Sequence, residues 1–201
     1  MIPVIPKPEP AAFNAAVRVP GNAWLTAKQL VLTAPLPKAV NPPPHWRSCL
    51  DDLHSQYQGV CAYLAVYIER ATGATSVDHF VAKSKNAGLT YEWSNYRLAC
   101  LSMNARKRAF DDVLDPFVMP DGVFHLELVS GRIFVNPSLT GKLAQDAEAT
   151  ITRLRLDCPN NREIRVRHFQ YYAEEAISQG HLKKMSPFVW AEANRQGLLS
   201  R

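Results

Sequence analysis

The sequence lacks a hydrophobic run long enough to cross a membrane. Its longest strongly apolar stretch, Cys61 to Ile68, is far shorter than the roughly 20 residues that a membrane-spanning helix needs. The N-terminal segment MIPVIPKPEP holds four prolines and no basic stretch leading into an apolar one, which argues against a secretory signal. We therefore expect a cytoplasmic protein with no membrane partner.

Cysteines are few and far apart. The four of them, Cys49, Cys61, Cys100 and Cys158, show no dense short spacing, which excludes the disulfide-rich scaffolds of small secreted proteins. Without a secretory signal we expect reduced thiols. The shares of hydrophobic (47%) and charged (20%) residues are ordinary for a globular protein, so a disordered or collagen-like chain is excluded as well.

Acidic residues are scarce in one window of the chain. Between His79 and Phe110, six Lys or Arg residues face the single acid Glu92, a charge of +5 that equals the net charge of the entire sequence. A basic region attracts polyanions, although an excess of this size is modest. The charge therefore permits a nucleic-acid partner without establishing one.

Prolines, by contrast, are concentrated at the N-terminus. Ten of the fifteen fall within the first 44 residues, and this density favours extended backbone over long helices. We interpret residues 1–44 as a proline-rich extended arm with a short helix near 23–32. Apolar residues such as Phe13, Val17 and Leu25 predict that the arm packs over the core.

The middle of the chain predicts a helix and three strands, and the last two strands and the helix after them give the order strand, strand, helix. Apolar residues three or four apart indicate a helix over 45–58, and β-rich runs indicate strands at 60–68, 76–81 and 96–100. Ser102 is placed to cap a helix that runs to Phe110.

The last third predicts a hairpin followed by helices. Two alternating runs, 123–129 and 132–135, flank Ser130-Gly131, a compact hairpin signal. Helical patterns follow over 138–156, 160–178 and 186–196. We therefore expect an α+β fold in one compact unit, composed of the arm (1–44), a core (45–120) and a hairpin with a helical C-terminal extension (121–201).

An acid, a base and an amide lie within the basic window. Asp78 and His79 are adjacent, and Asn104 follows on the predicted helix. Carboxylate and amide oxygens are hard ligands of the kind that hold Mg²⁺, and a histidine takes a proton from water at neutral pH. One divalent ion and one general base suffice for phosphodiester hydrolysis.

These residues resemble the signature of the HNH endonuclease family, whose three letters correspond here to His79, Asn95 and Asn104. Their separations of sixteen and nine residues fit the usual spacing. The segments DHF, KSK, YEWSNYRLAC and MNARK resemble a subgroup found in bacterial defence systems of the Septu or retron-associated type, where the nuclease is encoded beside an ABC-type ATPase. The likeness covers residues 61–110, about a quarter of the chain.

The resemblance implies a ββα-metal core that cuts nucleic acid, with DNA favoured over RNA as the substrate. Asp78 and Asn104 would bind Mg²⁺, with Mn²⁺ as a substitute, and His79 would be the general base. Asn95 would hold the loop and orient His79. The remaining part of the implied site is basic and would contact nucleic acid through Lys83, Arg106, Lys107 and Arg108.

One feature of the family is absent. Many members bind a structural zinc through two Cys-x-x-Cys pairs, but the second position of each pair is Leu64 or Met103 here. Two thiolates cannot make the four-ligand site that zinc prefers. We expect no structural zinc, and an apolar cluster of Cys61, Leu64, Cys100 and Met103 in its place.

Other interpretations remain open. The Asp78-His79 pair taken alone is more typical of a surface strand end, and the basic run 162–168 is more typical of a solvated helix face. The chain could be a DNA-binding module without catalysis, or a nuclease subunit that is active only with an ATPase partner.

Overall fold

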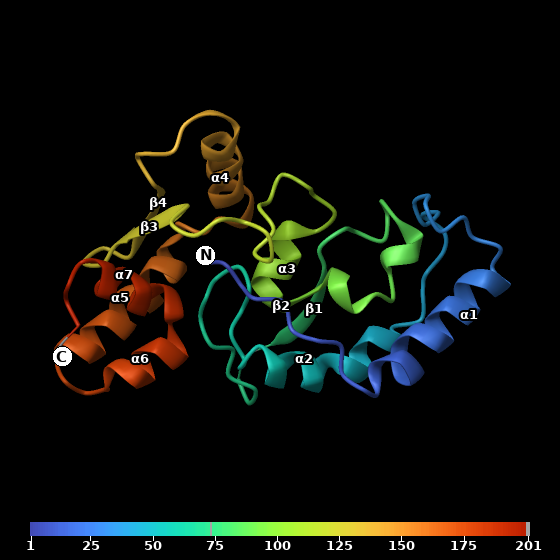
Figure 1. Cartoon of the computed structure of the whole chain (residues 1–201), viewed down its shortest axis with the longest axis horizontal. Coiled ribbons are helices and arrows are strands. Elements are labelled where there is room, and N and C mark those ends of the chain that lie inside the picture. Colours follow the sequence, from blue (N-terminus) through green and yellow to red (C-terminus); the bar gives the residue numbers. More distant parts are fainter. Residues whose placement is uncertain (73, 200–201) are drawn as a thin grey trace. The chain divides into compact units, whose positions relative to one another are not determined.

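The computed structural model of the chain describes residues 1–72 and 74–199, and it is mixed helix and sheet, as expected for α+β. The strands are β1 (Thr75–His79), β2 (Tyr96–Cys100), β3 (Phe124–Glu127) and β4 (Arg132–Val135). The α-helices are α1 (Val19–Ala27), α2 (Leu50–Gln56), α3 (Leu101–Lys107), α4 (Gly141–Leu154), α5 (Pro159–Ala173), α6 (Gln179–Met185) and α7 (Pro187–Arg195) (Figure 1). Short helical turns are η1 (Asn14–Arg18), η2 (His45–Cys49), η3 (Ala87–Leu89) and η4 (Trp93–Asn95). Within the described residues, none of the helices has the length and apolar character of a membrane span.

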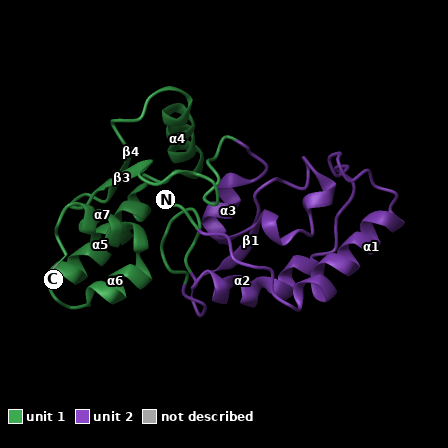
Figure 2. Cartoon of the chain, in the orientation of Figure 1, with its two compact units in different colours: residues 1–4, 60–68, 112–201 green, residues 5–59, 69–111 purple. Residues whose placement is uncertain are grey.

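The chain divides into two compact units (Figure 2). Unit 1 consists of Met1–Val4, Val60–Ile68 and Asp112–Arg201, and unit 2 consists of Ile5–Gly59 and Glu69–Asp111. This division differs from the expected three consecutive segments in one unit. Most of the arm shares a unit with the two strands at the predicted site, and residues 60–68 belong with the C-terminal part.

The predicted strand, strand, helix order is present in unit 2. β1 pairs antiparallel with β2 from Thr75 opposite Cys100 to His79 opposite Tyr96. β2 lies at the predicted residues, and α3 follows it without a loop. This arrangement places the C-terminal end of β1 beside the helix that carries Asn104.

The strand predicted over 60–68 is wrong. Among the described residues it forms no strand, and its bridge pairing is an isolated one between Val60 and Tyr67. The Ala65 N–H donates to the Cys61 carbonyl at 2.8 Å, and Ala65 has a positive φ of 53°, so the segment turns back on itself. Its β-branched and aromatic residues are mostly buried, which shows that the composition reflected burial rather than strand geometry.

The arm packs against the core, as the apolar residues predicted. The Phe13 ring meets the edges of Trp93 and Tyr96 at centroid distances of 5.5 and 5.7 Å. The arm's helix lies earlier than predicted, as η1 followed by α1. Its Gly21 is required by close packing, because a Cβ atom there would lie 2.2 Å from the ring of Tyr91.

Unit 1 contains the predicted hairpin and helices. β3 pairs with β4, and α4, α5 and α7 match their predicted ranges within a few residues at most ends. The exception is the end of α5, which lies at Ala173 and not at 178. Helix α6 was not predicted. The basic run on α5 is largely neutralised within this unit, since Arg162 pairs with Asp157 and Arg167 pairs with Glu163.

Candidate active site

A cleft of about 480 Å³ in unit 2 brings several predicted site residues together. Asp78 and His79 lie in its wall at the end of β1, with Asn104 on α3 and with Lys83 and Arg108 beside them. Its volume falls in the range of about 300–1,000 Å³ typical of ligand-binding clefts. Residues 26 positions apart in sequence thus line one concave site.

The proline-rich arm forms part of the same cleft, which the sequence did not predict. The arm contributes Leu36, Pro37, Lys38, Val40, Asn41 and Pro42 to the wall. The Leu36 N–H donates to the Lys83 carbonyl at 3.0 Å, and the Ala87 N–H donates to the Ala34 carbonyl at 2.8 Å. These bonds hold the arm beside the loop that follows β1. Proline density indicated extended backbone there but not what that backbone would face.

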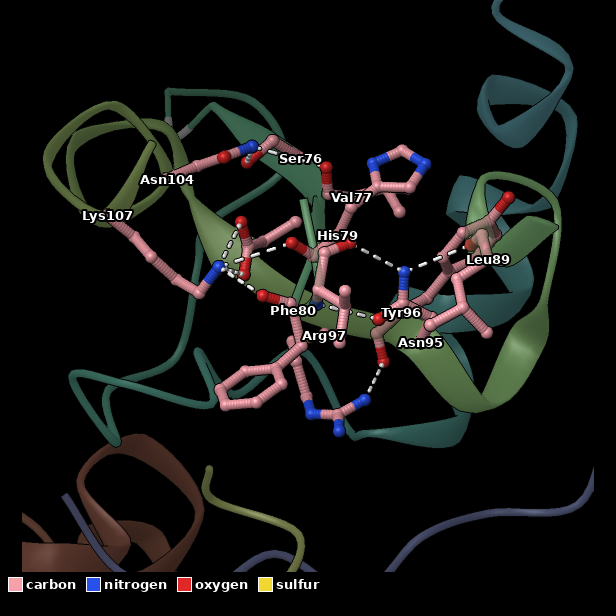
Figure 3. Close-up of polar contacts among 12 residues, drawn as sticks. Ser76, Val77, His79, Phe80, Leu89, Asn95, Tyr96, Arg97, Asn104 and Lys107 are labelled. Carbon is pink, nitrogen blue, oxygen red and sulfur yellow. Dashed lines mark hydrogen bonds and ion pairs between the residues drawn. The ribbon is translucent and has the colours of Figure 1, made fainter. Parts of the chain in front are cut away.

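Asp78 is buried, and the ammonium that pairs with its carboxylate also binds backbone carbonyls at the end of β1. Its side chain is 2% exposed, and Lys107 Nζ lies 3.3 Å from Oδ2 and 3.5 Å from Oδ1. The same ammonium donates to the backbone carbonyls of Phe80 at 2.8 Å and His79 at 3.2 Å (Figure 3). Lys107 therefore joins α3 to the end of β1 and offsets part of the Asp78 charge.

The position of Lys107 differs from the predicted phosphate contact. Its side chain is 0% exposed, because an ammonium that serves a carboxylate and two carbonyls must lie between the helix and the strand. Arg106 is half-buried and Arg108 is exposed. Of the four basic residues predicted to contact nucleic acid, Lys83 and Arg108 line the cleft.

His79 is held as a neutral imidazole. Its Nε2 lies 2.9 Å from the Thr90 carbonyl; since a carbonyl only accepts, Nε2 carries the hydrogen and Nδ1 holds the free lone pair. The ring meets the edges of Trp46 and Tyr96 at centroid distances of 4.9 and 5.0 Å. Burial, helped by the charge of Lys83, lowers the pKa of His79 from 6.5 to about 3. The ring is thus neutral at every physiological pH, and its Nδ1 is a weak base while the pKa stays this low.

This buried histidine predicts a loss of stability in acid. Because the folded pKa of His79 lies below the unfolded one, its contribution is complete above pH 6.5 and is lost as the pH falls toward 3. Protonation of the unfolded chain at pH 5 should cost about 2 kcal/mol through this residue alone. Urea unfolding at pH 7 and pH 5 measures it, and His79→Gln, which cannot charge, should reduce the pH dependence by that amount. An equal loss in both proteins would contradict the assignment.

Asn104 lines the cleft from α3, and two hydrogen bonds fix its side-chain amide. Its Nδ2 donates to the Ser76 hydroxyl at 3.1 Å and to the Val77 carbonyl at 3.2 Å (Figure 3). These bonds fix which end of the amide is the donor and leave Oδ1 as an acceptor. One carboxylate and one amide oxygen in a cleft fit the hard-ligand preference of Mg²⁺, which keeps several of its waters. Lys107 is a competing charge at Asp78, so the fit is to a weakly held ion.

Asn95 closes the loop between β1 and β2. Its Oδ1 accepts from the Val81 N–H at 2.8 Å, while Nδ2 donates to the carbonyls of Val81 and Leu89 at 3.0 Å each (Figure 3). The Asn95 carbonyl accepts from the Phe80 N–H at 2.9 Å. Its predicted role in holding the loop agrees with these contacts. Its contacts reach His79 through the backbone on either side of the loop.

Replacing Asn95 by alanine should therefore destabilise the loop. The change leaves the partly buried N–H and carbonyl of Val81 and carbonyl of Leu89 without the Asn95 amide, and a polar group orphaned in a buried position costs about 1–3 kcal/mol. We expect a loss of at least 2 kcal/mol, roughly, in the free energy of unfolding. Ser94→Ala is the neighbouring control, because Ser94 is exposed and contributes only its carbonyl, to Arg97. Equal stability of the two variants would rule out the bracing role.

Trp46 is a further residue of the cleft. Its side chain is half-buried and lines the cleft, and Lys83 Nζ lies over its ring, 4.0 Å from the centroid. Desolvation lowers the pKa of Lys83, and within the described part of the chain no carboxylate pairs with it. The one available signal was the place of Trp46 at the point where the arm ends and the first core helix begins.

The four positions that correspond to zinc ligands do not fall in one unit. Cys61 and Leu64 belong to unit 1, whereas Cys100 and Met103 belong to unit 2. The Leu64 N–H donates to Cys61 Sγ at 3.4 Å. Over residues 1–72 and 74–199, no group of three or more His, Cys, Asp or Glu side chains is placed to hold a metal ion. Asp78 and Asn104 are a pair of another kind, one carboxylate and one amide.

Comparisons with family models and with curated proteins found no match to this chain. The geometry of the cleft and the residues that line it are therefore the basis for inferring a function.

Proposed function

We propose that this chain is a metal-dependent HNH-type endonuclease that hydrolyses phosphodiester bonds, with DNA as the favoured substrate. The observation that carries the proposal is the cleft in which Asp78, His79 and Asn104 meet, built from two antiparallel strands and the helix that follows them. A carboxylate, an amide oxygen and a neutral imidazole in one basic cleft supply the groups that phosphodiester hydrolysis needs.

Each residue has a definite part in this mechanism. His79 Nδ1 takes a proton from the attacking water, and its Nε2–H bond to Thr90 fixes the ring. A bound phosphodiester adds negative charge beside the ring and pairs with Lys83, and both effects raise the pKa of His79 toward the working pH. Arg108 holds the phosphate backbone at the rim.

Asp78 and Asn104 would hold a Mg²⁺ or Mn²⁺ ion, which supplies charge for the phosphate oxygens and for the departing oxygen. Lys107 keeps the Asp78 carboxylate in place when the ion is absent.

Cleavage of supercoiled plasmid by the purified chain tests the proposal. Nicked or linear product should form with Mg²⁺ or Mn²⁺ and should be absent with EDTA. Activity that survives EDTA undiminished would contradict a metal-dependent nuclease. The same assay with single-stranded and duplex oligonucleotides keeps a substrate preference from being mistaken for inactivity.

A non-catalytic nucleic-acid-binding module is the second candidate, and one observation favours it. Lys107 already engages the Asp78 carboxylate, and a resident cation competes with a metal ion. Calorimetric titration with Mg²⁺ separates the two. Binding that is lost in Asn104→Ala supports the nuclease, whereas oligonucleotide binding without any Mg²⁺ binding supports the module.

The resemblance to defence nucleases supports a role against phage or other foreign DNA, with an ABC-type ATPase as partner. A chain that cuts only when the product of a neighbouring ATPase gene is added would be the catalytic subunit of such a system. Cleavage by the chain alone would make the ATPase dispensable for the chemistry.

A further inference from the structure

We propose that the cleft takes an unpaired strand, with one base stacked on Trp46 and the adjoining phosphate on Lys83. This inference rests on the proposed function and names its substrate class, single-stranded nucleic acid. The shared chemistry is an unstacked base next to a phosphodiester, and it is common to DNA and RNA.

The first support is the depth of the reactive groups. Asp78 is 1% exposed and His79 is 8% exposed, and the arm residues 36–42 form a wall of the same cleft. A phosphate must enter the cleft to reach them. A single strand bends to do so, whereas duplex DNA is stiff, with a persistence length of about 150 base pairs. A recessed site therefore favours the flexible strand.

The second support is the Trp46 and Lys83 pair. Proteins that hold single strands combine a basic groove with aromatic faces on which bases stack. Lys83 Nζ sits 4.0 Å from the Trp46 ring centroid, inside the cleft, and has no carboxylate partner among the described residues. An arriving phosphate draws this flexible ammonium off the ring, and the uncovered face becomes available to the base. In a duplex the bases stay stacked on one another and cannot use it.

The third support is the charge of the cleft. Lys38, Lys83 and Arg108 line it against the single acid Asp78. His79 is neutral and adds nothing to this sum. The walls therefore carry an excess of positive charge, which attracts a phosphodiester backbone whatever its sequence.

The test is binding of fluorescein-labelled oligonucleotides to the full chain in EDTA, so that cleavage does not interfere. The probes are a 15-nucleotide DNA, the RNA of the same sequence and a blunt duplex of two separate DNA strands. We expect the single strands to bind at least tenfold more tightly than the duplex. Trp46→Ala should weaken single-strand binding roughly 5- to 150-fold, the equivalent of one stacked base, and Trp46→Phe should retain most of the affinity.

Trp190→Ala is the matched control. Trp190 is also half-buried with a lysine, Lys183, 4.1 Å from its ring centroid, but it lies in unit 1, outside the cleft. Its loss should leave binding unchanged. Equal affinity for duplex and single strand, or equal effects of the two tryptophan variants, would overturn the inference.

The outcomes separate this inference from the proposed function. A chain that cuts duplex as fast as single strands keeps the nuclease and loses the unpaired substrate. A chain that binds single strands through Trp46 but never cuts keeps the inference about the strand and loses the nuclease. Tighter binding of DNA or of RNA decides which strand is the substrate.

Discussion

Replacing His79 by alanine is expected to slow cleavage by roughly 10²- to 10⁴-fold, the usual contribution of a positioned general base. The reason is the single lone pair on Nδ1, left free because Nε2 donates to the Thr90 carbonyl. The measurement is the initial rate of plasmid or oligonucleotide cleavage at saturating Mg²⁺. His181→Ala is the control, since His181 is exposed on α6 in the other unit.

A second variant separates chemistry from folding. In His79→Gln the side-chain amide still has an N–H to give to Thr90, but it has no basic lone pair at neutral pH. We expect it to stay folded, to bind oligonucleotides in EDTA as the parent does, and to be as slow as His79→Ala. Cleavage by His79→Gln at the parental rate would remove His79 from the mechanism.

The pH profile adds a sharper expectation. An ordinary histidine base loses kcat/KM below about pH 6.5, because that parameter reports ionisation of the free enzyme. The pKa of His79 is lowered to about 3 by burial and by Lys83. The acid limb due to His79 should therefore lie below pH 5, and kcat/KM should remain level between pH 5.5 and 7. Lys83→Met should move that limb toward neutral pH.

Much of the reactive end of unit 2 was predictable from sequence spacing. The β-rich runs placed β2 at its observed residues and β1 within two residues of its observed end. The antiparallel pairing and the short helix that follows then bring Asp78 and Asn104 to one cleft. Local pattern was sufficient for these residues because β1, β2 and α3 lie close together in the sequence.

What local pattern could not supply was the depth of the side chains. Lys107 was predicted at the surface because it lies in a basic run, yet it is buried between α3 and β1. One signal was available: Lys107 follows Asn104 by three residues, and residues three apart share a helix face. If Asn104 faces β1, so must Lys107.

The place of the arm in the cleft and the structure of segment 60–68 were not predicted, for a different reason. The extended backbone at residues 36–42 and the burial of apolar side chains at 60–68 were both predictable. Neither property indicates which other segment of the chain the stretch packs against. The arm's place is fixed by backbone bonds such as Leu36 to Lys83. Such long-range contacts depend on the assembled fold and not on neighbours in sequence.

Replacing Lys107 by methionine is expected to cost about 3–5 kcal/mol of stability, the usual result of removing one partner from a buried ion pair. Methionine fills a similar volume but leaves the Asp78 carboxylate, on a side chain that is 2% exposed, without its ammonium. It also leaves the carbonyls of His79 and Phe80 without a donor. Urea unfolding in EDTA measures the loss. Lys85→Met is the matched control, because Lys85 pairs with Asp111 at the exposed surface and should cost less than about 1 kcal/mol.

The double variant Asp78→Asn with Lys107→Met decides what the lysine does. If the pair is coupled, the double variant should lose at least 1 kcal/mol less, roughly, than the two single losses added together. A lysine that contacted phosphate would behave otherwise. Its removal would leave the unfolding free energy unchanged and would lower the salt dependence of oligonucleotide binding by about one charge. Because the ammonium is fully buried between a helix and a strand, we expect the salt dependence to stay the same and the stability to fall. Lys107 would then be a positioning residue, which holds the Asp78 carboxylate at the wall of the cleft.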